Sequence, residues 1–390
     1  MSPTSDRNHA LDGLRGVAAI IVVLSHAALF FYPALHGIGA ASNLESAVFS
    51  SPIPILYAGN FSVCVFFVLS GYVLSIKYSL TGDDTLVRGM FVKRYFRLMP
   101  AVLLVSLINC VLMKLGLMHN QIATSSDWAH SFFNMPPSLI DATHEGMWTN
   151  FVSGASLPSY NPPAWTMRVE FFGSLLVFAV CLLAKGNPFR WLVYILVMAA
   201  MYATTDRTGV CLSLFLVGMW IAEMPARSLS NSAAFVLVAM SAYLGSYHPG
   251  SAFHQPITTA IAWLPIRWPL YVVNAIAATL AFYSVLCNAE IARIFERFSE
   301  LGRRSYSFYL LHIGIFSSAG LWLFSWLADH FAPRPLAAGA STIFTILLTY
   351  LIAGPFTTWV DEPAIRGSGV VLRFLSSKTQ TRKTKDVYES

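Results

Sequence analysis

Long apolar runs recur along this chain from near its first residues to about position 360, and they constrain its fold more than any other feature. A helix of roughly 20 apolar residues crosses the hydrocarbon core of a bilayer, because it satisfies its backbone hydrogen bonds internally. Hydrophobic residues form 56% of the 390 positions and charged residues only 11%, whereas soluble domains carry about 25% charged residues. We therefore expect the fold class to be all-α: a polytopic integral membrane protein with about ten transmembrane helices.

The expected spans and their orientation follow from hydropathy and from the positions of Lys and Arg. The ten ranges are 14–32, 57–76, 99–118, 165–184, 190–204, 209–223, 231–247, 270–288, 305–327 and 336–360, and the fifth to seventh are short enough to be tilted or partly re-entrant. With both termini inside, the inner segments hold 20 of the 25 Lys and Arg. The other five are Lys114, Arg168, Arg207, Arg267 and Arg334. Because cytoplasmic segments are enriched in Lys and Arg, both termini are expected to be cytoplasmic.

Residues 1–370 are expected to form one transmembrane domain and the basic residues 371–390 a disordered cytoplasmic tail. Only 25 residues follow Ile365, so no fused extracytoplasmic domain is expected. The first apolar run could be a signal peptide, but Arg15 and His26 within it favour an anchor. The five cysteines lie in apolar runs without a CxxC pattern, which indicates neither a disulfide scaffold nor a metal site. The net charge of +6 gathers in the inner segments, so no nucleic-acid partner is expected.

Ionisable residues inside the apolar runs are functional candidates, because such a group at membrane depth is costly unless it faces protein or water. Arg15 and His26 are eleven positions apart, so they project from one helix face with a rise of about 16 Å between them. With Arg15 at the cytoplasmic edge, His26 lies near the middle of the bilayer. A histidine that hydrogen-bonds between helices for packing explains His26 equally well when it is taken alone.

Arg94 and Arg97 open the third expected span, just before Pro100. Arginines three residues apart share a helix face, and the guanidinium fork suits phosphate oxygens. Arg88 and Lys93 enlarge this basic patch, which could receive a phosphorylated cytosolic ligand. An ordinary positive-inside anchor is the simpler explanation of these residues taken alone.

Two further ionisable residues lie inside expected spans. Glu170 lies about one and a half turns below Trp165 at the outer entrance of the fourth span, within reach of an outer vestibule. An ion pair with a neighbouring helix would explain Glu170 equally well. His312 lies about two turns into the ninth span, and its isolation favours a packing role over a catalytic one.

Together these residues resemble the membrane-bound acyltransferase-3 family, whose members transfer acyl groups, often acetyl, to cell-surface or secreted carbohydrates and related molecules. Each motif is short, but the motifs occur in family order and span nearly the whole chain. They are Leu11-Asp12-Gly13-Leu14-Arg15-Gly16 with His26, Phe66-Phe67-Val68-Leu69-Ser70-Gly71-Tyr72, Arg94-x-x-Arg97, Asn161-Pro-Pro-Ala-Trp165 to Glu170, and Ser305 to His312.

The resemblance implies ten transmembrane helices, an acceptor presented on the outer side and a cytosolic acyl-coenzyme A donor, with acetyl-coenzyme A expected. It makes His26 the catalytic candidate and associates Arg94 and Arg97 with donor binding or activity. Many relatives have a less basic stretch and a second acidic residue where this chain has Met167-Arg168-Val169-Glu170-Phe171. The acceptor contacts are therefore expected to differ from those relatives.

We accordingly expect an O-acyltransferase in which His26 takes the proton of an acceptor hydroxyl as that oxygen attacks the acyl carbonyl. Arg15, Arg94 and Arg97 are expected to bind coenzyme A, and Glu170 to position the acceptor or relay a proton. A covalent acyl-histidine is an alternative that the sequence does not separate. Further candidates from the matching motifs are Asp12, Ser70, Trp165 and His312.

The expected acceptor is a carbohydrate, a glycolipid or a related small molecule, and the other partner is the lipid bilayer. We expect a multi-pass protein of the plasma membrane or a bacterial inner membrane, with its oligomeric state open. The competing class is a transporter or flippase without acyl-transfer chemistry, which would also use buried charges and a basic cytosolic mouth. Against it, the spans show no inverted or parallel halves, which many secondary transporters have.

Overall fold

The computed structural model describes residues 8–121, 126–154, 157–225 and 227–370. Every regular element in these ranges is a helix and none is a strand, so the predicted all-α class is confirmed. The α-helices are α1 (His9–Phe31), α2 (Asn43–Phe49), α3 (Gly59–Thr81), α4 (Asp84–Lys114), α5 (Asp127–His130), α6 (Leu139–His144), α7 (Trp165–Leu183), α8 (Arg190–Thr204), α9 (Arg207–Glu223), α10 (Asn231–Gly245), α11 (Gln255–Ile261), α12 (Pro269–Cys287), α13 (Ala289–Glu296), α14 (Ser299–Ile315), α15 (Leu321–His330) and α16 (Arg334–Phe356). These ranges also contain three π-helical segments, Glu145–Ser153, Phe316–Gly320 and Thr357–Asp361, and four short 3-10 helices, Pro33–His36, Ile53–Tyr57, Pro162–Ala164 and Ala252–His254; residues 362–370 continue the last segment as a helix.

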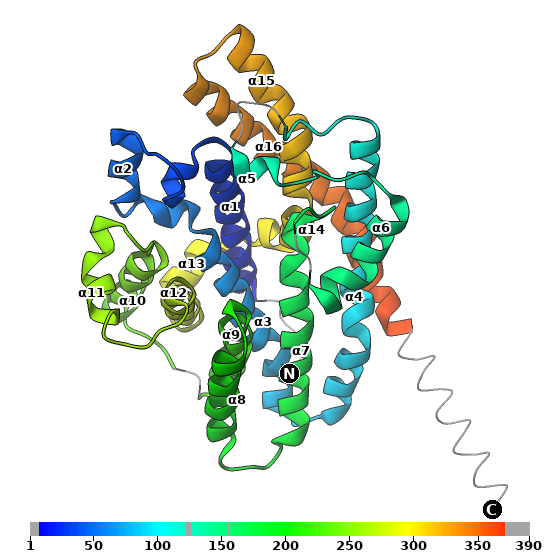
Figure 1. Cartoon of the computed structure of the whole chain (residues 1–390). Helices are drawn as coiled ribbons and strands as arrows, with labels where there is room; N and C mark the ends of the chain where they lie inside the picture. Colours follow the sequence, from blue (N-terminus) through cyan, green and yellow to red (C-terminus); the bar gives the residue numbers. More distant parts are fainter. Residues whose placement is uncertain (1–7, 122–125, 155–156, 226, 371–390) are drawn as a thin grey trace, which may run out of the picture.

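Helix α1 lies in the interior of the bundle, between helices that come from distant parts of the sequence (Figure 1). It packs along α14 and also contacts α3 and α13. Helices α10 to α12 form one side of the molecule, α4 lies on the opposite side, and α15 projects at one end (Figure 1). The helix that carries Arg15 and His26 is therefore a central element of the bundle.

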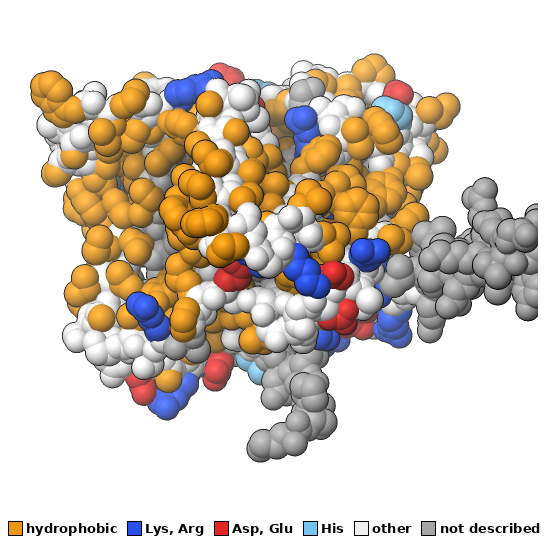
Figure 2. Space-filling view, turned by 90° about the horizontal axis from the view of Figure 1, so that it is seen from below, with side chains coloured by type: hydrophobic (Ala, Val, Ile, Leu, Met, Phe, Trp, Pro, Cys, Tyr) orange, Lys and Arg blue, Asp and Glu red, His pale blue; other side chains and the backbone are white. Residues whose placement is uncertain are grey.

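Seven helical segments of the described chain are long and apolar enough to cross a membrane, which confirms the prediction of a polytopic membrane protein. They are His9–Phe31, Gly59–Thr81, Asp84–Lys114, Pro162–Leu183, Pro269–Cys287, Ser299–His330 and Arg334–Val370. Arg190–Thr204 and Asn231–Gly245 are shorter apolar helices. The ten predicted ranges all lie largely on helices, while the number of spans and the side of the termini stay predictions. Figure 2 shows a broad band of hydrophobic side chains with charged side chains gathered along its lower edge.

Helix α4 begins earlier than predicted. The basic cluster between positions 88 and 97 was expected in a loop, but it lies on the first turns of a 31-residue helix. Asp83 caps this helix by accepting a hydrogen bond from the backbone N–H of Thr85, at 2.9 Å. The predicted range 99–118 covers the apolar part of this helix, because hydropathy does not report the polar turns before it. Pro100 lies inside the helix, and membrane helices tolerate an internal proline when neighbours satisfy the freed carbonyl.

Helices α1 and α14 approach so closely that their backbones touch. A Cβ atom on Gly302 would lie 1.8 Å from the Asp12 carbonyl oxygen, and one on Gly16 would lie 2.7 Å from the Gly302 nitrogen. A Cβ on Gly13 would lie 1.7 Å from the carbonyl oxygen of Phe295, just before α14. Small residues allow such close helix packing in membranes, so these glycines fix the distance between the two helices.

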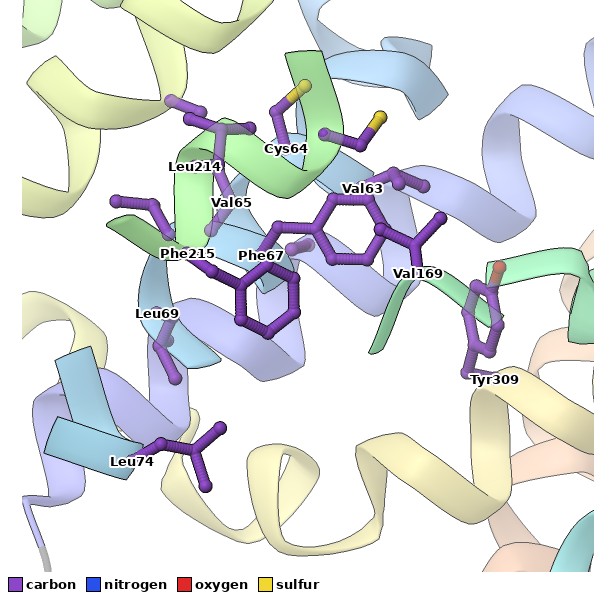
Figure 3. Close-up of a cluster of buried hydrophobic side chains, with 14 of the residues drawn as sticks. Val63, Cys64, Val65, Phe67, Leu69, Leu74, Val169, Leu214, Phe215 and Tyr309 are labelled. Carbon is purple, nitrogen blue, oxygen red and sulfur yellow. The ribbon is translucent and has the colours of Figure 1, made fainter. Parts of the chain in front are cut away.

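Helices α3 and α9 form a second close pair. A Cβ on Gly71 would lie 2.1 Å from the Phe215 carbonyl oxygen, and one on Gly218 would lie 2.0 Å from the Val68 carbonyl oxygen. Figure 3 shows side chains of α3, such as Phe67, packed with Phe215 of α9 in the buried core. This pair holds α3 in place beside α1.

In the connection between α4 and α7, the π-helical residues Glu145–Ser153 pack onto α4. The carboxylate of Glu145 accepts hydrogen bonds from Ser159 Oγ at 2.7 Å and from the backbone N–H groups of Tyr160 and Asn161 at 3.1 Å. These contacts anchor the Asn161-Pro-Pro segment that leads into α7.

Candidate active site

Six of the predicted site residues gather around one cavity of about 380 Å³. The residues come from α1, α3, α4 and α7, which the sequence separates by as many as 158 positions. They are Asp12, Arg15, Ser70, Arg94, Arg97 and Glu170. We call this space the first cavity. Its location is at the end of the bundle predicted to face the cytosol.

The guanidinium of Arg94 forms a buried ion pair with Glu170 inside the first cavity. Arg94 is only 6% exposed, and Ser70 Oγ donates a further hydrogen bond to Glu170 Oε1 at 2.9 Å. The pair joins α4 to α7. Glu170 was expected to be reached from an outer vestibule, but the structure places it in the first cavity against Arg94. The ion pair with a neighbouring helix, considered as the structural alternative, is therefore present.

The other cations of the first cavity lie nearer its mouth. Arg15 is 3.6 Å from Asp12, and Arg303 donates a hydrogen bond to Glu362 at 2.7 Å. Arg97 is exposed and forms no ion pair with a carboxylate in the described chain. Arg97 is thus the arginine of the predicted pair that is better placed to meet an anionic ligand.

The two predicted histidines meet each other. His26 Nδ1 lies 2.7 Å from His312 Nε2, and the two ring planes differ by only 9°. His312 Nδ1 in turn lies 2.6 Å from the carbonyl oxygen of Tyr309. His312 is fully buried. The residue that looked isolated in the sequence is therefore the direct partner of His26.

This geometry determines which nitrogen carries each proton in the neutral pair. A carbonyl oxygen only accepts hydrogen bonds, so His312 Nδ1–H must donate to Tyr309. The Nε2 of neutral His312 is then an acceptor, and His26 Nδ1–H donates to it. His26 Nε2 is left with its lone pair. A ring held in one tautomer by its second nitrogen is the arrangement required of a positioned general base.

A smaller cavity of about 140 Å³ lies beside His26, and we call it the second cavity. It is lined by His26 and Trp165 together with twelve other residues. Val63 and Tyr309 line both cavities, so they form the wall between them. The Tyr309 hydroxyl donates to the Pro163 carbonyl at 3.0 Å and accepts from Thr166 Oγ1 at 3.2 Å. The Asn161-Pro-Pro segment thereby holds one side of the wall.

Trp128 of α5 covers His26 from the segment 119–164. Its ring centroid lies 5.4 Å from that of His26, with 20° between the planes. Trp128 also packs edge-on against Phe132, at 4.4 Å between centroids. The stacked tryptophan ring therefore restrains the orientation of the His26 ring.

The sequence did not reveal Tyr309, His36, His248 or Trp128 as site residues. Tyr309 lies one turn before His312 on α14, and this spacing could have identified it. His36 and His248 lie between helices without a periodic pattern, so only the folded structure brings them to the second cavity. Trp128 resembled an ordinary interfacial tryptophan.

Within the described residues, no three His, Cys, Asp or Glu side chains gather in a manner that could hold a metal ion. All five cysteines are free thiols, four of them buried.

Comparisons with known proteins add an independent observation. A family model described as an acyltransferase domain matches residues 8–354. The chain is 24% identical to "Acyltransferase clz18" of Cochliobolus lunatus, over 90% of this chain and 93% of that protein. It is also 24% identical to "Acyltransferase R4" of Phoma sp., over 91% of this chain and 93% of that protein. No solved structure matches the chain significantly.

Proposed function

The chain belongs to the membrane-bound acyltransferase-3 family, and from this premise we propose that it transfers an acyl group from acyl-coenzyme A in the first cavity to a hydroxyl of an acceptor in the second. Family membership and the names of both relatives favour an acyltransferase over the transporter or flippase considered above. The observation that carries the proposal is the His26–His312 pair: His26 lines the second cavity, which shares the wall of Val63 and Tyr309 with the first.

The charges of the first cavity support an acyl-coenzyme A donor. Phosphates bind arginine through charge-assisted, often bidentate hydrogen bonds. Arg97 and Arg15 are the proposed phosphate contacts, while Arg94 is already paired with Glu170 and holds α4 against α7. The first cavity is bounded on one side by Val63 and Tyr309, which also line the second cavity of only about 140 Å³. A short acyl group such as acetyl fits this limit.

The proposed chemistry uses the lone pair of His26 Nε2. The acceptor oxygen attacks the acyl carbonyl carbon as its proton passes to Nε2, and a new C–O bond forms. The C–S bond then breaks, and the leaving thiolate takes the proton from the imidazolium. During the step His26 Nδ1–H keeps donating to His312, which stabilises the positive charge on His26. His312 is in this scheme a positioning residue, held by the Tyr309 carbonyl.

An acyl-histidine intermediate on the same Nε2 is the second mechanism that the geometry allows. Both mechanisms need the lone pair of Nε2, and they differ in whether the donor reacts before the acceptor binds. Rapid quenching with radiolabelled acetyl-coenzyme A and without acceptor separates them. Label that stays on the denatured protein and disappears in His26→Gln supports the covalent route.

The acceptor is proposed to be a carbohydrate, a glycolipid or a related small molecule at the outer surface of the plasma membrane or a bacterial inner membrane. The test is mass spectrometry of surface polysaccharides and secreted metabolites from cells with and without the protein. We expect a product that is heavier by one acyl unit only when the wild-type chain is present, and absent with His26→Gln at equal membrane abundance. Identical mass profiles from cells that contain the folded wild-type protein would contradict the proposed function.

A further inference from the structure

The second cavity contains three imidazole rings, of which only His26 belongs to the proposed reaction. His36 and His248 come from connections between helices, and their ring centroids lie 5.5 Å apart. Both line the cavity with His26. The chemical character of this cavity therefore depends on the protonation of three histidines rather than one.

The backbone determines where the protons of His36 and His248 lie. His36 Nε2 is 3.3 Å from the Ser25 carbonyl oxygen, so this nitrogen donates, and Nδ1 keeps its lone pair. His248 Nδ1 is 3.1 Å from the Ser246 carbonyl oxygen, so it donates, and Nε2 keeps its lone pair. With His26 Nε2, three ring nitrogens around one cavity are left as hydrogen-bond acceptors.

Both outer rings are neutral near pH 7. Burial, together with the neighbouring His248, lowers the pKa of His36 to about 4. Burial also lowers the pKa of His248 below its ordinary value. Neutral imidazoles keep these lone pairs, so the cavity offers a ligand acceptors rather than positive charge.

No Lys, Arg, Asp or Glu of the described chain lines the second cavity. The guanidinium of Arg207 lies over the rings of Trp165 and Tyr271, at 5.6 Å from each centroid, and is not part of the lining. The remaining polar groups are uncharged: Ser25, Asn60 and Asn274. Asn274 Nδ2 donates to the Leu244 carbonyl at 3.4 Å, which leaves its oxygen to accept. An anion placed here would face three imidazole lone pairs and no cationic side chain, and its only donors would be uncharged ones, such as Ser25, Asn60 and the backbone N–H groups at the start of α3.

From these observations we infer that the second cavity binds the reacting end of an uncharged acceptor that donates hydrogen bonds from at least two hydroxyl groups, in preference to acceptors that carry a carboxylate or phosphate beside the reacting hydroxyl. One hydroxyl faces His26, and the others donate to His36 and His248. Trp165 and Leu270 supply the apolar surface against which the carbon skeleton of the acceptor packs. This inference rests on the proposed function, because it identifies the class of acceptor for the same reaction.

The test uses the purified full-length protein in detergent and three small probes of similar size. The probe trans-1,4-cyclohexanediol donates two hydrogen bonds, trans-1,4-dimethoxycyclohexane donates none, and trans-4-hydroxycyclohexanecarboxylate is an anion at pH 7.5. Saturation-transfer NMR measures the affinity of each. We expect the diol to bind roughly tenfold more tightly than either other probe, because each hydrogen bond contributes about 0.5–1.5 kcal/mol. Equal affinities, or no binding of the diol, would overturn the inference.

Substitutions assign any preference to this cavity. His36→Phe and His248→Phe remove a lone pair while keeping a flat ring, and each should weaken diol binding several-fold. His36→Gln keeps an acceptor and should retain most of the preference. His330→Phe, at the exposed end of α15, is the matched control and should bind the diol as wild type does. Coenzyme A binding, measured in parallel at the first cavity, shows that each variant is folded. Undiminished diol affinity in folded His36→Phe and His248→Phe would overturn the inference.

Acetyl transfer, measured by thiol release from acetyl-coenzyme A with the same probes, separates this inference from the proposed function. A diol preference that both variants lose, without any acetyl transfer, would remove the proposed function and keep the binding site. Acetyl transfer to the hydroxycarboxylate as fast as to the diol would keep the function and overturn the inferred acceptor class. Transfer to the diol alone supports both.

Discussion

The two cavities meet at Val63 and Tyr309, yet their chemistry is opposite. The first is the larger and is lined by arginines and carboxylates, whereas the second is lined by neutral rings, amides and aliphatic side chains. Phosphate recognition needs cations, and a general base needs a neutral imidazole with a free lone pair. By dividing these tasks between adjacent spaces, the bundle keeps the cations away from the hydroxyl that must lose its proton.

The largest expected effect comes from replacing His26, the proposed base that connects the donor of the first cavity with the acceptor of the second. We expect His26→Ala and His26→Gln to lower acyl transfer by a factor of about 10²–10⁴, the range for positioned proton transfer. Coenzyme A affinity should stay near wild type, because the first cavity does not include His26. Turnover at saturating donor is the measurement, with His330→Gln as control. A folded His26→Gln within a few-fold of the wild-type rate would leave only a packing role for His26.

Variants of the buried Arg94–Glu170 pair test whether these two charges stabilise the fold or bind the donor. Arg94→Met leaves Glu170 buried without its partner, which should lower the free energy of unfolding by about 3–5 kcal/mol. Arg94→Met combined with Glu170→Met should recover most of this loss. Lys185 and Asp84 connect the same two helices through an exposed pair at 2.9 Å, and Lys185→Ala should cost at most about 1 kcal/mol.

Reversible unfolding in mixed micelles measures these differences, and donor binding by the double variant completes the test. A folded double variant that binds acyl-coenzyme A as wild type does would make Arg94 and Glu170 a structural pair. A large loss of donor affinity would instead indicate that Arg94 contacts the phosphates of the donor, as the sequence predicted.

The glycine contact between α1 and α14 holds together the two helices that carry His26 and His312. Gly302→Ala should lower the free energy of unfolding by roughly 1–3 kcal/mol, because a methyl group would overlap the Asp12 carbonyl. The forced separation of the helices should also lengthen the contact between His26 and His312 and lower turnover. A Cβ on Gly339 in α16 would meet no described atom within 4 Å, so Gly339→Ala should leave turnover unchanged. Thermal unfolding and turnover of both variants check this contrast.

Arg97 is an exposed arginine of the first cavity, and its variants test the proposed phosphate contact. We expect Arg97→Ala to weaken acyl-coenzyme A binding roughly tenfold, since a hydrogen bond to a charged group contributes about 1.5–3 kcal/mol and this side chain is exposed. Arg97→Lys should restore part of the affinity, because it keeps the charge but not the fork. Arg88→Ala, on the same helix but outside the cavity lining, is the control. Equal donor affinity in Arg97→Ala and Arg88→Ala would make the arginine an orientation anchor.

The smallest effect concerns acid stability and the second cavity. His36 faces Tyr57, His248 and Ser25, and its pKa is lowered to about 4, below the ordinary value of about 6.5 expected in the unfolded chain. The unfolded chain therefore binds the proton more readily, so stability is lost as the pH falls from about 6.5 towards 4. Between pH 7.5 and 5.5 this loss should be about 1 kcal/mol. The unfolding free energy of His36→Gln should depend less steeply on pH over the same interval; an unchanged slope would contradict the neutral assignment of His36.

The sequence predicted the helices well and singled out charged residues that line the first cavity, because both depend on local signals. Apolar runs identify helices by composition, and Arg15, Arg94 and Glu170 are conspicuous because they interrupt such runs. The start of α4 was missed because hydropathy does not report the polar turns before its apolar part.

The second cavity could not be predicted in the same way. His312 resembled a packing residue because its partner is 286 positions away, and no periodicity reports a contact made by helix packing. His36 and His248 are single residues between helices, and their proton positions depend on backbone carbonyls of Ser25 and Ser246. Side-chain roles that depend on such long-range contacts require the folded structure.

The thin wall of Val63 and Tyr309 has an electrical consequence. Two water-filled cavities that open to opposite sides of a charged membrane would short-circuit it unless something between them stops ions. An aliphatic side chain and a phenol whose hydroxyl is occupied by Pro163 and Thr166 form such a barrier. Larger side chains at either position would obstruct the acyl group, and smaller ones would open a route for ion leakage. In the proposed arrangement, with donor and acceptor on opposite sides of the membrane, the wall would be the insulator that keeps the voltage while the acyl group is transferred.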